Sequence, residues 1–252
     1  MSKVLEFKNV SMHFCDQKGE FEVLKDISFS VDEGEIVAIL GPSGSGKTTI
    51  LNLIAGLITP TNGEIITYGS IGYMFQRDHL FEWKNIYDNV LLGLVLQKNV
   101  NKETIAEVER MLKIYGLWDF RNHYPSQLSG GMRQRVALIR TLAITPKILL
   151  LDEPFASLDY QTKIIVIEDV YKIIKQEKKS TILVTHDIAE AISIADRIIV
   201  LTKRPAQIKS IHPIKLSTSH EQSPLKNRKA VEFKDYFDVI WRELNDEQKE
   251  LR

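Results

Sequence analysis

The eight residues from Gly41 to Thr48 have the types and the spacing of a loop that binds phosphate groups. Glycines let a backbone wrap around an anion so that successive N–H groups point inward, and the N-terminus of a following helix adds positive charge. Lys47 can neutralise the β- and γ-phosphates, and the hydroxyl of Thr48 can ligate Mg²⁺. A Gly/Ser-rich turn without a ligand is the alternative, but a strand precedes the segment and a helix follows it. The predicted phosphate-binding loop consists of Gly41, Pro42, Ser43, Gly44, Ser45, Gly46, Lys47 and Thr48.

Two acidic residues, Asp152 and Glu153, directly follow the apolar run Ile148–Leu151. A buried strand delivers such residues to the carboxyl edge of a parallel sheet, where open α/β folds bind ligands. Asp152 can hold Mg²⁺, directly or through water, and Glu153 can polarise a water molecule for attack on a γ-phosphate. An acidic turn at the end of a strand is the alternative interpretation.

Two further polar residues end predicted strands. His186 follows Leu183-Val184-Thr185, so it shares that edge of the sheet and can contact the γ-phosphate, the water and Glu153. Gln76 follows Ile71–Phe75 and can touch both Mg²⁺ and water without adding charge. A structural histidine and an exposed polar strand end are the corresponding alternatives.

A second anion site is predicted in the segment Leu128–Arg135, with the sequence LSGGMRQR. Ser129 can cap a helix, and Gly130 and Gly131 allow another backbone or ligand to approach closely. A capped helix start with a glycine hinge is the alternative. If both sites are real, one chain carries two phosphate sites about 80 residues apart in sequence, counted from Lys47 to Ser129.

The elements that position these residues alternate between strand and helix, which indicates crossover connections and a mostly parallel sheet. The region from about 78 to 140 is helical instead, with Asn101 as an N-cap and Gly116 as a stop. We expect strands within 4–31 and at 36–40, 65–68, 71–75, 148–151, 181–184 and 197–201, and helices at 47–57, 162–177 and 188–195.

Composition narrows the class of protein. The 252 residues include 33 Lys+Arg and 33 Asp+Glu, so no charge footprint points to nucleic acid or anionic lipid. Cys15, the single cysteine, suits a reducing compartment. Charge within the first six residues argues against a secretory signal, and the apolar runs are too short to span a bilayer. We therefore expect a cytoplasmic chain that acts at a membrane only through a partner.

Taken together, the segments resemble the ATP-binding subunits of ABC transporters over roughly residues 4–204. Gly41–Thr48 looks like the Walker A loop, Gln76 the Q-loop, Leu128–Gln134 the signature, Ile148–Glu153 the Walker B segment, Ser157–Asp159 the D-loop and His186 the switch histidine. The resemblance implies ATP and Mg²⁺ as ligands, with Phe14 or the nearby Phe21 stacked on adenine. It implies catalytic roles for Glu153, His186 and Gln76, and metal contacts for Thr48, Gln76 and Asp152. The implied nucleotide contacts include, besides the phosphate loop, the residues Thr49, Ser129, Gly130, Gly131, Gln134 and Asp159.

The implied fold is α/β: a P-loop NTPase with a mostly parallel core sheet, an N-terminal antiparallel β subdomain and an inserted α-helical subdomain. The ATPase domain would span 4–228, with the helical subdomain at about 77–140. Residues 229–252 would form an amphipathic C-terminal helix or tail. Docking of this helix on its own domain is favoured over a partner contact. Its apolar stripe is Ala230, Phe233, Phe237, Ile240, Trp241 and Leu244.

In the family, two ATPase domains sit head to tail and clamp ATP between the Walker A loop of one and the signature of the other. The resemblance thus implies a second copy or a homologous ATPase as partner, a pair of transmembrane permease subunits, and an indirect link to an extracytoplasmic substrate-binding protein. It places the chain at the cytoplasmic face of the membrane, with no nucleic acid involved.

A finer resemblance, to the nitrate/sulfonate/taurine importer branch, rests on Phe81–Val90, LSGGMRQR and Leu158–Thr162. That branch usually has proline where Glu82 stands, so the permease contact near Trp83 would differ here. The transported substrate is not fixed, because related importers of other small organic molecules share these features. The alternatives are an exporter or lipoprotein-release ATPase, and a non-transport ABC ATPase acting on ribosomes or DNA.

Overall fold

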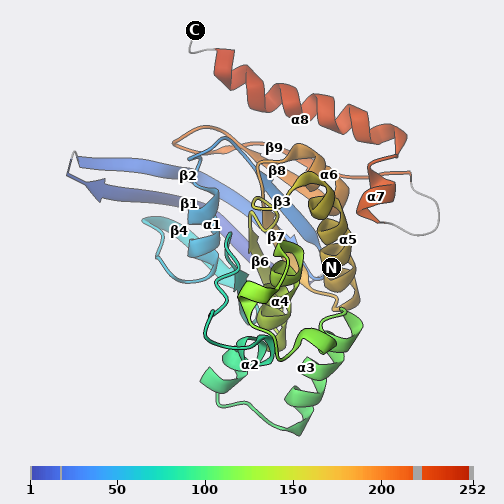
Figure 1. The fold of residues 1–252 in the computed structure, drawn as a ribbon. Coiled ribbons are helices and arrows are strands. Elements are labelled where there is room, and N and C mark those ends of the chain that lie inside the picture. The colour runs from blue at the N-terminus through green and yellow to red at the C-terminus, as the bar shows by residue number, and fades with distance from the viewer. Residues whose placement is uncertain (1, 18, 218–222, 250–252) are drawn as a thin grey trace.

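A six-stranded sheet forms the centre of the computed structural model, which describes residues 2–17, 19–217 and 223–249 (Figure 1). The strand order is β5-β6-β7-β3-β8-β9, and every neighbouring pair is parallel except β8 and β9. The mostly parallel sheet is therefore confirmed. The strands are β3 (Ile36–Leu40), β5 (Ile71–Met74), β6 (Ile148–Asp152), β7 (Ser180–Val184), β8 (Arg197–Leu201) and β9 (Ile208–Pro213).

A separate three-stranded sheet, in the order β2-β1-β4, is antiparallel throughout. It consists of β1 (Lys3–Asp16), β2 (Gly19–Asp32) and β4 (Asn62–Thr67). The long hairpin of β1 and β2 projects to one side of the molecule in Figure 1. Phe14 and Phe21 are opposite each other near its tip. This sheet is the N-terminal antiparallel unit that the family resemblance implied.

The central strands separate two hydrophobic cores, because alternate side chains of a strand point to opposite faces. Ala38, Leu40 and Leu149 face a core built mainly by helices. Val37 and Ile39 face a second core, shared with β1, β2 and the helix that follows β3. Burial on both faces explains why these strands are continuous apolar runs in the sequence.

The helices begin and end at recognisable residues. Asn101 caps α3 through the backbone N–H groups of Glu103 and Thr104, and Gly116 follows its end with a φ of 68°. The first helix is shorter than expected: α1 ends at Ile54, and Gly56, with a φ of 68°, turns the chain. The α-helices are α1 (Lys47–Ile54), α2 (Ile86–Leu96), α3 (Lys102–Ile114), α4 (Gly130–Ala143), α5 (Tyr160–Gln176), α6 (Ile188–Ile194), α7 (Pro224–Asn227) and α8 (Val231–Lys249).

Two elements of the C-terminal region were not predicted: the edge strand β9 and the short helix α7. The last helix, α8, lies over the β8–β9 end of the central sheet (Figure 1) and packs Phe233, Phe237 and the fully buried Ile240 on the helical core. This is the expected docking of the tail on its own domain. Trp241 departs from the expectation, because it is 54% exposed and stacks on Phe237 instead. Residues 250–252 of the predicted tail lie outside the described part.

Candidate nucleotide site

The loop Gly41–Thr48 connects β3 to α1, and its shape requires glycine. Gly44 and Gly46 have φ values of 77° and 93°, in the left-handed region that L side chains rarely adopt. At Gly46 a β-carbon would also lie 2.8 Å from Leu24 Cδ2 and 2.9 Å from Val23 Cγ1. The loop therefore approaches strand β2 too closely for any side chain at this position.

Lys47, the first residue of α1, is buried beneath the loop. Its Nζ donates to the carbonyl oxygens of Gly41, at 2.9 Å, and Pro42, at 3.0 Å. Burial lowers the pKa of Lys47, while the charges of Glu153 and Asp152 oppose this shift. The hydroxyl of Ser45 is also buried and has no hydrogen-bond partner in the described part of the chain. A buried cation and an unpartnered donor suit the phosphate oxygens that the loop was predicted to bind.

Thr48 and Asp152, two of the three predicted metal-binding residues, are in contact, and the third, Gln76, contacts Glu153 instead. The Thr48 Oγ1 donates to Asp152 Oδ2 at 3.0 Å, and the Tyr73 hydroxyl lies 3.5 Å from the same oxygen. Burial raises the pKa of Asp152, although the Thr48 hydrogen bond opposes this. One carboxylate and one hydroxyl fit Mg²⁺, which binds few protein oxygens and takes the rest from water and substrate phosphates. Among the described residues no group of three acidic, histidine or cysteine side chains is placed to hold a metal ion.

Glu153, Gln76 and His186 meet at the carboxyl edge of the sheet. Gln76 Nε2 donates to Glu153 Oε2 at 3.3 Å, and His186 Nδ1 lies 3.3 Å from the same oxygen. Glu153 has a φ of 43°, and its N–H donates to the carbonyl of Val184. Strain of this kind is uncommon for a residue with a side chain and concentrates at functional sites. The three side chains that were predicted from separate strand ends are thus in contact.

A cavity of about 560 Å³, large enough for a nucleotide, is lined by the phosphate loop, Glu153 and His186, whereas Gln76 and Asp152 are not among the described residues that line it. Arg204, which follows β8, lines it as well and was not predicted. The guanidinium donates to the Gly44 carbonyl at 3.0 Å and lies 5.5 Å from the centre of the Phe21 ring. Nothing in the local sequence marks Arg204, because it is 160 positions from Gly44 and belongs to no phosphate motif. The lining consists of Ser43, Gly44, Gly46, Lys47, Thr48, Thr49, Glu153, His186 and Arg204.

Phe14 and Phe21, the candidates for adenine stacking, lie on facing strands of the hairpin. Their ring centres are 6.2 Å apart, and both side chains are partly exposed. The same hairpin carries Val23 and Leu24, which contact the phosphate loop at Gly46. Phe21 is connected to the nucleotide cavity through Arg204, and neither ring is among the described residues that line the cavity.

The signature segment lies at the start of α4. Ser129 is exposed, and its Oγ accepts the N–H of Met132 at 3.3 Å. Gly131 is buried, and a β-carbon there would lie 2.7 Å from Val166 of α5, so the glycine allows α4 and α5 to pack closely. Gln134 is only 3% exposed, so its side chain is not presented at the surface with Ser129. None of the described residues that line the nucleotide cavity comes from this segment.

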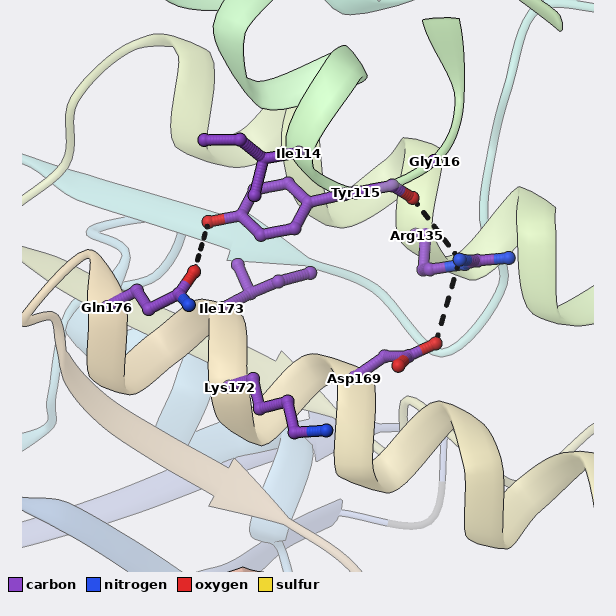
Figure 2. A pocket seen from close by; sticks show the side chains of 8 residues that line it. All are labelled: Ile114, Tyr115, Gly116, Arg135, Asp169, Lys172, Ile173 and Gln176. Atoms are coloured by element: carbon purple, nitrogen blue, oxygen red, sulfur yellow. Dashed lines mark hydrogen bonds and ion pairs between the residues drawn. The ribbon is translucent and has the colours of Figure 1, made fainter. Parts of the chain in front are cut away.

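Arg135 fixes α4 against its neighbours, as Figure 2 shows. Its Nη1 donates to the Tyr115 carbonyl at 3.2 Å and lies 3.6 Å from Asp169 Oδ2 of α5. Beside it is a separate cavity of about 280 Å³, walled by Ile114, Ile173 and their neighbours (Figure 2). On the other side of α4, Arg133 pairs with Asp78, two residues beyond Gln76. The signature segment and the loop that carries Gln76 are therefore connected through helix α4.

The D-loop residue Asp159 begins α5. Its Oδ1 accepts the N–H of Thr162 at 3.1 Å, so the carboxylate caps the helix. Like Ser129, Asp159 is exposed. Its predicted contact with a nucleotide is not made through the cavity described above, whose lining does not include it among the described residues.

This fold, with two nucleotide motifs on one chain, defines an ATP-binding cassette. The family profile described as "ABC transporter" matches residues 24–156, and the chain belongs to this family as an ATP-binding subunit, an ATPase. It is 41% identical to the uncharacterized ABC transporter ATP-binding protein YtlC of Bacillus subtilis, with 98% of both chains covered. It is also 41% identical to the nitrate import ATP-binding protein NrtD of Synechocystis, covering 94% of this chain and 93% of NrtD.

Solved structures agree with this assignment. The cassette MJ0796, in a dimeric post-hydrolysis state bound to ADP and Pi, is 33% identical and covers 84% of this chain and 99% of that one, with a TM-score of 0.72. A further relative matched by sequence, the taurine import ATP-binding protein TauB of Jannaschia, is 36% identical over 94% of both chains. Within the described ranges no helix is long and apolar enough to cross a membrane.

Proposed function

We propose that this ATPase powers a small-molecule importer as a head-to-tail dimer that closes over MgATP. The position of the signature carries the proposal: Ser129 is exposed and caps the N-terminus of α4, which begins at Gly130, yet neither is among the described residues that line the cavity beside Lys47. An anion site that faces outward can contact phosphate only across an interface. A second copy, or a homologous ATPase, would supply the missing half of each site.

Within each half, the residues of this chain have distinct roles. Lys47 and the loop N–H groups bind the β- and γ-phosphates, while Thr48, Asp152 and Gln76 would hold Mg²⁺. Bound Mg²⁺ neutralises charge on the phosphate oxygens. Glu153 accepts a proton from the attacking water, and His186 holds that water and the carboxylate in register. The contacts of Gln76 and His186 with one oxygen of Glu153 support these assignments.

The relatives support the dimer and the importer. The solved MJ0796 cassette is a dimer bound to ADP and Pi, and NrtD and TauB are named for the import of nitrate and taurine. ATP-driven closure and release after hydrolysis would move a permease pair between its two states. The chain would thus work at the cytoplasmic face of the membrane. Its ATPase domain would span residues 4–228, with the helical subdomain at about 77–140. A substrate-binding protein would act on the far side, and substrate choice would rest outside this chain.

The surface around Trp83 is the proposed contact with the permease. Trp83 is 74% exposed, with its ring 4.8 Å from that of Phe81. Beneath it, Asn89 is fully buried and donates to the carbonyls of Phe81, Lys84 and Asn85. A loop held by Asn89 that presents an exposed tryptophan beside the half-buried Phe81, a few residues after Gln76, suits an interface that must transmit closure of the nucleotide site.

Co-purification from membranes tests the proposed function. We expect the tagged chain to retain a membrane protein with several spans, and Trp83→Ala to reduce its recovery at least about tenfold, because exposed aromatic residues are typical interface anchors. Trp241→Ala, at a second exposed tryptophan on α8, is the matched control and should leave recovery unchanged. Equal recovery with both variants would contradict the Trp83 surface. Retention of ribosomal or nucleic-acid components instead of a permease would contradict transport.

Phe14 and Phe21 can be separated by their effects on nucleotide affinity. We expect Phe14→Ala to weaken ATP binding about 5- to 150-fold, because stacking of a base on an aromatic ring contributes about 1–3 kcal/mol. Phe21→Ala is the matched control on the facing strand and should change affinity by less. Equilibrium binding of ATP and of inorganic triphosphate distinguishes the two contributions, since only ATP has a base to stack. The reverse order of the two variants would assign the stacking to Phe21.

A further inference from the structure

Lys163 connects two elements that carry predicted nucleotide residues. It lies in the first turn of α5, and its N–H donates to the carbonyl of Asp159 at 2.8 Å. The side chain turns toward α6, where its Nζ is 2.8 Å from Asp187 Oδ2 and 3.0 Å from Glu190 Oε1. One ammonium group therefore bridges the helix after the D-loop and the helix after His186.

The bridge is largely removed from water. The side chain of Glu190 is 3% exposed and that of Lys163 is 17% exposed. Burial opposes the charged form of Lys163, yet the hydrogen bond with Asp187 and the charge of Glu190 hold its pKa above the usual value. A buried carboxylate such as Glu190 needs a cation beside it, because an uncompensated charge in the interior is strongly unfavourable. Lys163 therefore supplies the cation that compensates the buried carboxylate of Glu190.

The same network holds the backbone on both sides of His186. Thr185 is buried, and its hydroxyl donates to Glu190 Oε2 and accepts the N–H of Asp187 at 3.1 Å. Asp187 Oδ1 accepts the N–H of Glu190 at 3.1 Å and so caps α6. His186 is left without such bonds to this network, and its imidazole reaches Glu153 at 3.3 Å. The residues before and after the histidine are therefore fixed while its ring extends into the nucleotide cavity.

We infer that Lys163 is a positioning residue, which sets His186 at its working distance from Glu153 and ties that distance to the placement of Asp159. The inference rests on the proposed role of His186 in hydrolysis. A change in the position of the D-loop at the dimer interface would be transmitted by Lys163 to Asp187 and Glu190, and from there to the histidine between them. Closure of the interface and alignment of the attacking water would then be one event.

Steady-state ATPase kinetics of the purified chain test the inference. We expect Lys163→Met to lower kcat about 10- to 100-fold with KM for ATP nearly unchanged, because a misplacement of about 1 Å is enough to cost about 100-fold in rate. Lys163→Arg keeps the charge and the bridge and should restore most of kcat. A wild-type kcat for Lys163→Met, or an Arg variant as slow as the Met variant, would overturn the inference.

A second pair of variants separates positioning from folding. Lys163→Met leaves Glu190 buried without its cation, so a loss of Tm is expected. The double variant Lys163→Met/Glu190→Gln removes that charge, and we expect it to regain Tm while kcat stays low. Recovery of kcat together with Tm would show that the ion pair is only structural, and would overturn the inference even if Lys163→Met alone fails to fold.

His186→Ala distinguishes failure of the inference from failure of the proposed function. In the His186→Ala background we expect Lys163→Met to cause less than about a twofold further loss of kcat, because the two residues act through the same contact. Fully multiplicative losses would overturn the inference and leave the role of His186 intact. Unchanged kcat in His186→Ala itself would instead overturn the proposed role of the histidine.

Discussion

Glu153→Gln is expected to lower the rate of ATP hydrolysis about 10²- to 10⁴-fold, the usual contribution of a general base, while ATP still binds. The amide keeps the size of the side chain and can still contact Gln76 and His186, which lie 3.3 Å from Glu153 Oε2. It cannot accept the proton of the attacking water. Because hydrolysis opens the proposed dimer, the variant should also accumulate as an ATP-bound dimer.

Phosphate release and size-exclusion chromatography with ATP measure the two halves of this prediction. Glu64→Gln is the matched control, since Glu64 is an exposed residue of β4 whose one ion pair, among the described residues, is with Lys8 at the surface. It should retain the wild-type rate. Unchanged hydrolysis in Glu153→Gln would exclude Glu153 as the base, and loss of ATP binding would mean that the side chain holds substrate instead.

The parts of the site that the sequence predicts are those encoded by short segments. Gly41–Thr48 is recognisable because the glycine conformations, the buried lysine and the threonine hydroxyl are all set within one turn between β3 and α1. Asp152 and His186 follow from a simple rule, since parallel strands bring their carboxyl ends to one edge. Gln76 and His186 both contact one carboxylate oxygen of Glu153, because the strands that precede these three residues are adjacent in the order β5-β6-β7.

What could not be predicted depends on tertiary neighbours. Arg204 enters the cavity because β8 is adjacent to β3, and no local pattern near Arg204 encodes that pairing. Similarly, the bridge from Lys163 to Glu190 requires α5 and α6 to pack, and each residue alone is typical of a solvated helix surface. Gly131 likewise has a tertiary role that the sequence does not show. Its predicted nucleotide contact stays a prediction, and its lack of a side chain also allows α4 to pack against Val166 of α5.

The edge strand and the C-terminal helix were predicted least well, because only some of their side chains pack in a hydrophobic core. Strand β9 alternates between partly buried and exposed residues and pairs with β8 on one side only, so its apolar pattern is weak. In α8 the stripe was placed correctly for Ile240 but not for Trp241, one position away. A stripe defined at about 100° per residue does not resolve which edge of the helix reaches the core.

Ser129→Arg, combined with Glu153→Gln, is expected to abolish the ATP-dependent dimer. Ser129 is exposed at the N-terminus of α4, where the proposed partner would present its γ-phosphate. An arginine side chain fills the space in which the two halves must approach within hydrogen-bond distance, so size-exclusion chromatography with ATP should show a monomer. ATP should still bind each monomer, because the cavity beside Lys47 is lined by other residues.

Two controls isolate the effect of bulk at this position. Ser129→Ala removes the cap on the Met132 N–H, a loss of about 0.5–2 kcal/mol in stability, and the hydroxyl that would contact the partner's nucleotide, but it adds no bulk and should still dimerise. Ser70→Arg adds the same side chain at an exposed turn between β4 and β5 and should also dimerise. If Ser129→Arg in the Glu153→Gln background still forms ATP-dependent dimers, the signature does not face the partner's nucleotide. The outward-facing anion site at α4 would then require a different ligand, and the head-to-tail arrangement would be wrong for this chain.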